Sequence, residues 1–396
     1  MKHFLISIII PTRNRQIYCE QAIRHIYSLS TEIQIVVNDN SDERYLEKQI
    51  NDLIDGERLI YHFFKERISA VDNYDIAASF ATGEFFCAIG DDDTVLSTII
   101  DCAYWMKKNK IDAVKPFKKN CYWWPDKERD RGDIKKEGIV TCPPLSCNVS
   151  LYNPYESVIQ LLKTGGQGYL SLHMVGSYHG LVRKKCMDKV KAITGHYYGG
   201  CSPDIYSATC LSLLPGIKFV EIGMPITLPG VCPLSTSADS VKGKHVGKLE
   251  SAPQFIGMKM PYVWDKRIPQ YYSVETIWAE CFLKALTAMK KDELIEKYFN
   301  YKALYTAMYE NNPNQKEEIL LLLGDKIKDI NSKRKALKTT KGRVLDYGNR
   351  IKRTILRQKL KLTPCNSIAI AALKTEQFLK RYDNRNKWKK ILTTSV

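Results

Sequence analysis

Apolar residues in the first 117 positions alternate between short continuous runs and stretches with helical spacing. The continuous runs lie at residues 4–10, 33–37, 59–64, 85–89 and 113–117, and the first of them is rich in β-branched residues. Helical spacing follows the first four runs, at residues 17–29, 45–53, 71–82 and 94–109. Because strands that alternate with helices form βαβ units, this pattern predicts an α/β fold with a mostly parallel sheet flanked by helices.

Beyond residue 117 the regular alternation stops. Residues 118–154 mix charges, aromatic residues and prolines, which predicts a long lid-like loop. Residues 231–257 are rich in Ser, Gly and Lys and predict a second, mobile loop. Shorter elements are expected as a helix at 157–163, a helix at 205–214 and a strand at 217–222. Helical spacing then predicts a helical C-terminal region with helices at 274–289, 292–309 and 316–330.

The end of the chain differs from the rest in its charge. The 396 residues carry a formal net charge of +17, and residues 326–396 hold 21 Lys and Arg against 4 Asp and Glu. Residues 341–362 place their apolar side chains on one helical stripe, and a second helix is predicted at 366–391. A basic amphipathic segment of this kind binds anionic membranes, so residues 341–396 are predicted to lie on a membrane surface. The alternative is a helical pair that packs on the body with its charges solvated.

Cysteine usage and hydropathy bear on the compartment. The 12 cysteines lack the paired short spacings of a zinc site, which predicts reduced and mostly buried thiols. No segment approaches the roughly 20 apolar residues needed to span a bilayer, and the run at 4–10 is too short for a signal sequence. We therefore expect a cytoplasmic protein, held peripherally on the inner face of the cell membrane by its basic segment.

The most unusual feature of the sequence is the turn after the fourth predicted strand, where Asp91, Asp92 and Asp93 follow one another. The carboxyl ends of strands in open α/β sheets border the ligand crevice. Adjacent carboxylates repel one another, and a hard cation such as Mn²⁺ or Mg²⁺ that carries substrate phosphates relieves the repulsion. The alternative is an acidic turn that caps the helix predicted to begin near Thr94.

Four segments carry a resemblance to a known family. They are PTRN after the first strand, NDNSD after the second, RISAVDNY leading into the third helix, and TGEFFCAIGDDD around the fourth strand. In this order they resemble the GT-A glycosyltransferases of family 2. The resemblance implies a Rossmann-like GT-A domain, a nucleoside diphosphate sugar donor, usually of uridine, a divalent metal, and inversion at the anomeric carbon. The first strand has no Gly-rich turn after it, which argues against a dinucleotide-binding dehydrogenase.

Carried over to matching positions, the resemblance implies two groups of donor-site residues. The nucleotide would be contacted by Pro11, Thr12, Arg13, Asp39, Arg67 and Asn73, with Asp39 accepting hydrogen bonds from the base. Asp91 would face the ribose and the metal, and Asp93 would bind the metal directly. Asp92 would be able to exchange roles with either neighbour.

Asp204, in the tripeptide Ser-Pro-Asp, is our candidate for the general base. It stands roughly where family members carry their catalytic acidic residue, although the usual Glu-Asp pair is absent. An acceptor hydroxyl that attacks an oxocarbenium-like carbon needs a carboxylate to take its proton. The alternative is that Pro203 and Asp204 only open a helix.

Four further side chains have candidate roles beside a structural alternative for each. His179, Trp123 and Trp124 are predicted acceptor contacts, the tryptophans by stacking on sugar rings. His245 is predicted as a late metal ligand or a contact to the diphosphate.

These observations predict three parts. Residues 1–260 would form the GT-A domain, with a nucleotide-binding half at 1–117 and an acceptor-binding half at 118–260. A helical region at 261–330 and a basic tail at 331–396 would follow. The expected function is metal-dependent transfer of a sugar from a UDP donor to a glycan or lipid-linked acceptor in surface polysaccharide synthesis.

Two other functions remain open from the sequence. A sugar-1-phosphate nucleotidyltransferase would need a Gly-rich, lysine-bearing first loop, which PTRNR is not. A protein that binds nucleic acid through the basic tail would leave the three aspartates unexplained, because they repel a polyanion. The pattern does not predict an oligomeric state.

Overall fold

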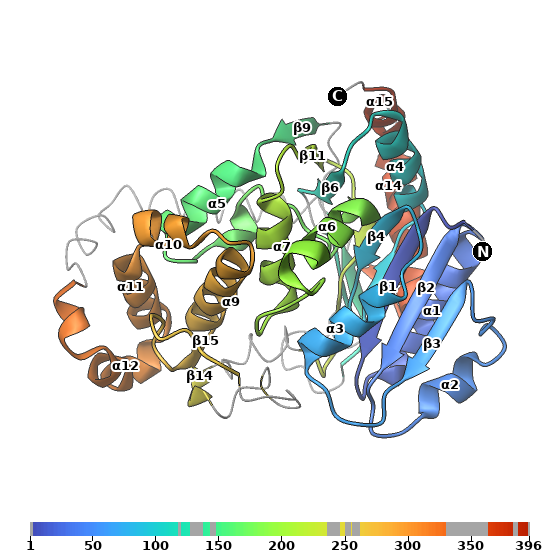
Figure 1. The fold of residues 1–396 in the computed structure, drawn as a ribbon. Coiled ribbons are helices and arrows are strands. Elements are labelled where there is room, and N and C mark those ends of the chain that lie inside the picture. The colour runs from blue at the N-terminus through green and yellow to red at the C-terminus, as the bar shows by residue number, and fades with distance from the viewer. Residues whose placement is uncertain are drawn as a thin grey trace.

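The computed structural model describes residues 3–117, 120–126, 138–142, 148–235, 246–249, 255, 262–329, 363–382 and 387–394. One eight-stranded mixed sheet, with the strand order β3-β2-β1-β4-β10-β6-β11-β9, runs through the molecule between two layers of helices (Figure 1). The mostly parallel α/β sheet followed by a helical region confirms the predicted fold class.

The first half of the sheet follows the predicted alternation closely. In chain order its elements are β1 (Ile6–Thr12), α1 (Gln16–Leu29), β2 (Ile33–Asp39), α2 (Tyr45–Ile50), β3 (Leu59–Phe63), α3 (Ala70–Ser79) and β4 (Phe85–Ala88). These four strands are parallel to one another. Successive residues of β1 pack on opposite faces, with Ile8 and Ile10 in one apolar cluster and Ile9 in the other. A strand buried on both faces therefore explains the continuous apolar runs.

The second half of the sheet is mixed. After β5 (Thr94–Val95) and α4 (Thr98–Lys108), its elements are β6 (Ala113–Pro116), β9 (Val149–Tyr152), α5 (Pro154–Lys163), β10 (Leu181–Arg183), α6 (Lys184–Thr194), α7 (Pro203–Ser212) and β11 (Phe219–Ile222). β10 runs antiparallel to both β4 and β6, and β11 is parallel to β6. The sequence did not predict β10 or α6, because a three-residue strand leaves too short a pattern to recognise.

The start of the fourth helix is a correction to the sequence prediction. Thr94 and Val95 were expected to open a helix, but they form β5, which pairs antiparallel with β12 (Thr227–Leu228). The helix α4 begins only at Thr98. The partner strand lies more than 130 positions away, so local spacing gave no sign of it.

The predicted lid-like loop and mobile loop contribute a small second sheet where they are described. Its order is β13-β7-β8-β16, with β13 (Gly230–Val231), β7 (Cys121–Trp123), β8 (Ile139–Thr141) and β16 (Thr363–Pro364). A further pair joins β14 (Val246–Gly247) to β15 (Tyr272–Ser273). The described parts of both loops therefore contain paired strands.

The helical region lies at the end of the molecule opposite β1, β2 and β3 (Figure 1). It comprises α9 (Val274–Ala288), α10 (Asp292–Tyr298), α11 (Tyr301–Asn311), α12 (Lys316–Leu323) and a 3₁₀ turn at Gly324–Asp329. The single helix predicted at 292–309 is broken by Asn300, whose side chain accepts a hydrogen bond from Ala303 N. An asparagine in that position caps the start of a new helix and thereby ends the old one.

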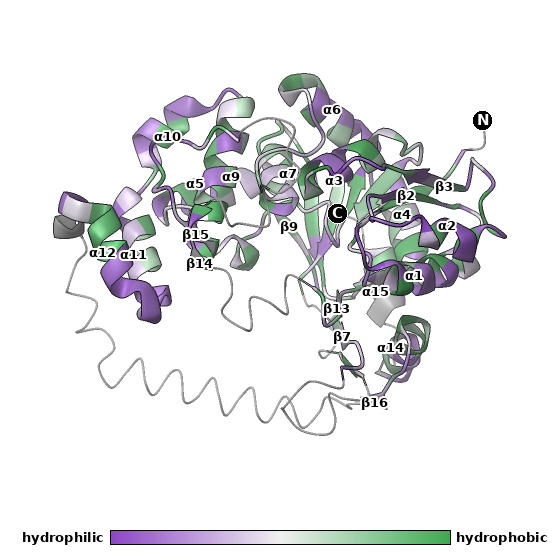
Figure 2. Ribbon diagram, turned by 90° about the horizontal axis from the view of Figure 1, so that it is seen from below, coloured by the Kyte–Doolittle hydropathy of each residue, from purple (hydrophilic) through white to green (hydrophobic). Residues whose placement is uncertain are grey.

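The described part of the basic tail packs on the body, as the alternative interpretation expected. It forms α14 (Ile368–Tyr382) and α15 (Lys387–Thr393), which lie beside α1 and α4 (Figure 2). Ile368, Ala371 and Leu379 are buried in the same cluster as β1. The predicted amphipathic stripe at 341–362 lies outside the described residues.

The cysteines agree with the thiol prediction. All eleven cysteines within the described part of the chain are free, and ten of them are buried. Within that part, no helix combines the length and the apolarity that crossing a membrane requires.

Candidate active site

The candidate site lies where the carboxyl ends of β1, β2 and β4 meet. From β1 the chain proceeds outward through β2 and β3 and then returns to β4 on the other side of β1, so the strand order reverses between β1 and β4. This switch point is where open α/β sheets bind ligands. Thr12, at the end of β1, lies opposite Asp39 at the end of β2. Thr12 Oγ1 also donates a 2.6 Å hydrogen bond to Asp91 Oδ2 across the crevice.

Asp91 is fully buried and is paired with Arg15. Arg15 Nε lies 3.2 Å from Asp91 Oδ2, and Arg15 Nη2 lies 2.7 Å from Asp91 Oδ1. The second contact lacks the angles of a hydrogen bond, so Oδ1 is buried without a hydrogen-bond donor. Arg15 is the residue directly before α1, which places its guanidinium over the acidic turn.

Asp92 connects the turn to the segments after residue 120. Its Oδ2 accepts a 2.9 Å hydrogen bond from Cys232 N, and its backbone carbonyl accepts one of 2.9 Å from the indole of Trp124. Its Oδ1 lies 3.6 Å from Arg15 Nη1. Two carboxylates therefore face the same guanidinium.

Asp93 is surrounded by donors. Its Oδ2 accepts hydrogen bonds from Gly90 N at 2.6 Å and Tyr178 Oη at 3.0 Å, and it lies 3.1 Å from His179 Nε2. Its Oδ1 accepts a 2.6 Å bond from Gly230 N. A Cβ on Gly230 would stand 1.8 Å from the carbonyl oxygen of Asp92, so only glycine brings this amide close enough.

Burial and charge set the protonation of the three acids. Burial raises the pKa of Asp91, although Arg15 opposes the shift. Burial, together with the neighbouring charge of Asp93, raises the pKa of Asp92 to about 7. Burial acts in the same direction on Asp93, but the contact with His179 and the amides of Gly230 and Gly90 hold its pKa below the usual value. Asp93 is thus the most firmly ionised of the three.

The acids offer a hard-oxygen set of the kind that Mn²⁺ and Mg²⁺ prefer. The observation that favours a cation is Asp91 Oδ1, which is buried without a hydrogen-bond donor and faces the same guanidinium as Asp92. Asp93, expected to bind the metal directly, has its two oxygens engaged by four donors. Within the described ranges, no three His, Cys, Asp or Glu side chains are grouped to hold a metal. His245 lies outside those ranges.

His179 is held in a strained backbone conformation beside the acids. Its φ of 58° is unusual for a residue other than glycine, and its amide donates to Ala88 O at 3.0 Å. The ring lies between Asp93 and Thr227, with Nδ1 3.1 Å from Thr227 Oγ1. Non-glycine residues with such φ values cluster at functional sites. Both ring nitrogens of His179, the predicted acceptor contact, thus lie against neighbouring side chains, one of which is Asp93.

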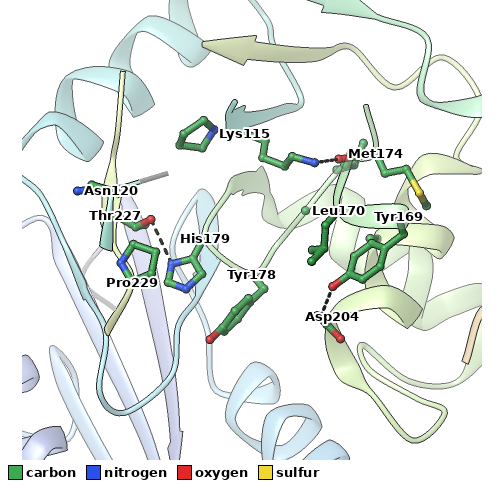
Figure 3. Close-up of a pocket in the computed structure, with 14 residues that line it drawn as sticks. Lys115, Asn120, Tyr169, Leu170, Met174, Tyr178, His179, Asp204, Thr227 and Pro229 are labelled. Atoms are coloured by element: carbon green, nitrogen blue, oxygen red, sulfur yellow. Dashed lines mark hydrogen bonds between the residues drawn. The ribbon is translucent and has the colours of Figure 1, made fainter. Parts of the chain in front are cut away.

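A pocket extends from Tyr178 and His179, which contact Asp93, to Asp204 (Figure 3). Tyr178 and His179 form one part of its wall, and Tyr169 and Asp204 form another. The remaining lining residues are Lys115, Pro116, Asn120, Leu170, Met174, Val175, Gly176, Ala208, Thr227 and Pro229. The fold therefore brings the predicted base and the predicted acceptor histidine into one cavity.

Asp204 lies in the first turn of α7, directly after Pro203. Its Oδ1 accepts a 2.5 Å hydrogen bond from Ser202 Oγ, and its Oδ2 accepts one from the hydroxyl of Tyr169. Asp204 therefore both opens a helix, as the alternative proposed, and lines the pocket. Burial, followed by the charge of Asp204, raises the pKa of Tyr169 well above its usual value, so the phenol remains a donor.

The predicted nucleotide residues lie along the ends of β1, β2 and the β3–α3 connection. Buried Asp39 accepts hydrogen bonds from Ser41 N at 2.9 Å and from Tyr61 Oη at 2.9 Å. Arg13 contacts Asp42 at 2.7 Å near the surface, and Arg67 is exposed. Pro11 is buried within β1.

Asn73 has its side-chain amide engaged inside the fold. It donates to Thr12 O at 3.2 Å and accepts from Asn38 Nδ2 at 2.7 Å, which ties α3 to β1 and β2. Its contacts therefore support the edge of the sheet on which the nucleotide residues lie.

The prediction for Trp124 is wrong. Its side chain is 2% exposed, its indole N–H is bonded to Asp92, and its ring lies 4.8 Å from that of Tyr18. A buried ring cannot stack on a sugar. The Trp124 indole instead holds the acidic turn in place through its bond to the Asp92 carbonyl. Trp123 is partly buried in β7, and neither tryptophan lines the pocket.

Sequence reasoning missed four residues that contact the acids: Arg15, Tyr178, Gly230 and Cys232. Arg15 is the last residue of the PTRNR segment, so the sequence pattern could have predicted that it lies near the crevice. The other three come from segments far along the chain, and no local pattern marks them.

Comparisons with known proteins show the following. Residues 7–148 match the family described as Glycosyl transferase family 2. A solved structure of S. aureus TarS 1-349 in complex with UDP-GlcNAc is 14% identical, with 84% of this chain and 83% of that chain covered and a TM-score of 0.45. The mannosyltransferase PcManGT from Pyrobaculum calidifontis, in complex with GDP-Man and Mn²⁺, is 13% identical, with 83% and 88% covered and a TM-score of 0.39. No curated protein matches the sequence.

The raised pKa of Asp92 predicts how stability depends on pH. The folded protein retains a proton on Asp92 up to about pH 7, whereas the unfolded chain releases it near the ordinary value of 3.8. Stability must therefore fall as pH rises from about 4 to 7, at up to about 1.4 kcal/mol per pH unit. Denaturant unfolding of the metal-free protein should show this fall, and Asp92→Asn should flatten it. Equal slopes for the two proteins would contradict the assignment.

Proposed function

We propose, from the match of residues 7–148, that this chain belongs to glycosyl transferase family 2. It transfers a sugar, with inversion, from a uridine diphosphate donor to a hydroxyl group of a glycan or lipid-linked acceptor. The observation that carries the proposal is the pocket that Asp204 lines together with Tyr178 and His179, because both of these side chains contact Asp93 of the acidic turn. Glycosyl transfer from a nucleotide sugar is the activity of the family. That membership favours glycosyl transfer over nucleotidyl transfer and over nucleic-acid binding.

Residues 1–117 bind the donor in this proposal, and residues 118–260 bind the acceptor. Asp39 contacts the base at the end of β2, and Arg13 and Arg67 approach the nucleotide from the adjacent loops. Asn40 supports that arrangement, because its side chain bonds to Phe64 O, Glu66 O and Ile68 N and so fixes the loop that carries Arg67.

Asp91 and Asp92 would hold Mn²⁺ or Mg²⁺ on the oxygens that face Arg15. The chemistry that a cation held by these residues would supply is stabilisation of the negative charge on the departing nucleoside diphosphate. Asp93 helps to position these two acids, because its own hydrogen-bond donors fix the turn. The remaining steps belong to the side chains of the pocket.

Asp204 accepts the proton of the attacking hydroxyl. Tyr169 and Ser202 fix the orientation of its carboxylate, which lines the pocket proposed to hold the acceptor. A positioned carboxylate of this kind contributes about 10²- to 10⁴-fold to the rate.

Thermal unfolding with nucleoside diphosphates tests the donor site. UDP at 100 times its dissociation constant should stabilise the protein by about 2.7 kcal/mol, and only when Mn²⁺ or Mg²⁺ is present. GDP, CDP and ADP at the same concentration serve as matched controls. If the folded protein responds to no nucleotide with either metal, the proposed donor site is wrong.

Asp204→Asn tests the base. The asparagine keeps the size of the side chain and loses the proton acceptor, so nucleotide stabilisation should persist while turnover falls by about 10²- to 10⁴-fold. Release of UDP from the donor sugar, with water as the acceptor, measures turnover without knowledge of the natural acceptor. Asp52→Asn, at a surface pair with Arg24, is the control and should retain full turnover. An unchanged rate in Asp204→Asn would refute the role.

We also propose that residues 341–396 hold the enzyme on an anionic membrane beside a lipid-linked acceptor used in surface polysaccharide synthesis. The 21 basic residues after position 325 support this, and so does the outer face of α14, where Ile370 is 42% and Leu373 54% exposed.

Co-sedimentation with vesicles of anionic lipid should exceed that with zwitterionic vesicles and should weaken in 0.5 M salt, because each basic residue near the surface contributes about 1 kcal/mol. Replacing Ile370 and Leu373 with Ser should weaken it further. Equal recovery with both vesicle types would contradict membrane binding.

A further inference from the structure

The acidic turn contains a cation of its own. Arg15 contacts both oxygens of Asp91, at 3.2 and 2.7 Å, and its third nitrogen lies 3.6 Å from Asp92. In the described part of the chain, no other Lys or Arg forms an ion pair with Asp91 or Asp92. The guanidinium therefore provides the neutralisation that a divalent cation provides elsewhere.

Arg15 and a metal cannot both be accommodated as the structure stands. Asp91 Oδ1 is the buried oxygen without a hydrogen-bond donor, and Arg15 Nη2 lies directly against it at 2.7 Å. A cation that binds this oxygen must displace the guanidinium, because two positive charges at such a distance repel each other and occupy the same space. Asp93 is not an alternative ligand for the cation, because four donors engage its oxygens.

The displacement requires only the side chain to move. The carbonyl of Arg15 accepts hydrogen bonds from Tyr18 N and Cys19 N at the start of α1, so the backbone is fixed. The side chain is 24% exposed, and among the described residues its one further hydrogen-bond contact is with Cys232 Sγ at 3.9 Å. A guanidinium presents a planar fork of donors that suits a phosphate group as well as a carboxylate. The new partner available at this crevice is the diphosphate of the donor.

We propose that Arg15 competes with the divalent cation for Asp91 and Asp92 while the donor site is empty, and that it moves to the donor diphosphate when nucleotide and metal bind together. The inference rests on the proposed donor site and adds a consequence for the order of binding. Metal alone binds weakly because it must separate Arg15 from the acids. Nucleotide gives the displaced arginine a partner, so each ligand strengthens the other by the same factor.

Titration with Mn²⁺ tests the competition directly, with free Mn²⁺ measured by electron paramagnetic resonance. Without nucleotide, Arg15→Gln should bind Mn²⁺ at least about tenfold more tightly than the original protein, since the competitor is gone. The factor by which UDP strengthens Mn²⁺ binding should shrink in the variant. Arg24→Gln removes a surface arginine paired with Glu20 and Asp52 and should change neither value.

Arg15→Lys covers the case in which Arg15→Gln does not fold. Lysine keeps the positive charge but cannot contact Asp91 through two nitrogens. The Arg15→Lys variant should therefore bind Mn²⁺ without nucleotide more tightly than the original protein does. If the folded variant binds Mn²⁺ no more tightly than the original, Arg15 does not compete and the inference is overturned. That outcome is distinct from failure of the donor site, which the absence of UDP stabilisation in the original protein would show.

Discussion

Three carboxylates buried at the end of β4 set the constraint on which the site depends. An ionised carboxylate transferred from water into a protein interior costs several kilocalories per mole unless donors or an opposite charge compensate it, and a whole domain is stable by only about 5 to 15 kcal/mol. Each acid must therefore be compensated individually. Asp93 is compensated by hydrogen-bond donors, whereas Asp91 and Asp92 retain raised pKa values although Arg15 opposes the effect of burial at both.

The compensation draws distant segments of the chain to one edge of the sheet. Thr12 is the last residue of β1, Arg15 lies in the first crossover, Tyr178 precedes β10, and Gly230 and Cys232 follow β12. The segment before β10 is held to β4 by Ala88, which bonds to Ser177 and His179 through its backbone. The acidic turn therefore ties the second half of the fold to the first.

Local patterns predicted what local interactions decide. The strands and helices up to β4 have enough apolar residues in register to reveal their spacing, and the acidic turn was found from three adjacent residues. β5 and the contacts of Trp124 escaped because their partners, β12 and Asp92, are distant in sequence. Arg15 escaped for a different reason, since its neighbourhood was recognised but the side chain that it faces is 76 positions away. Asp204 was identified through family resemblance, because no periodicity distinguishes a catalytic carboxylate from a helix cap.

The segment of Tyr178 and His179 links the two chemical halves of the site. Both side chains touch Asp93 on one side and line the pocket of Asp204 on the other. In a displacement at an anomeric carbon, the leaving diphosphate and the attacking hydroxyl lie on opposite faces of the sugar. In the proposed reaction this segment would lie between those two positions. His179 has a left-handed backbone conformation, and both Tyr178 and His179 reach Asp93 before the chain enters β10. The match to family 2 ends at residue 148, so this segment connects the acidic turn, inside the matched region, to Asp204, the candidate base, which lies outside it.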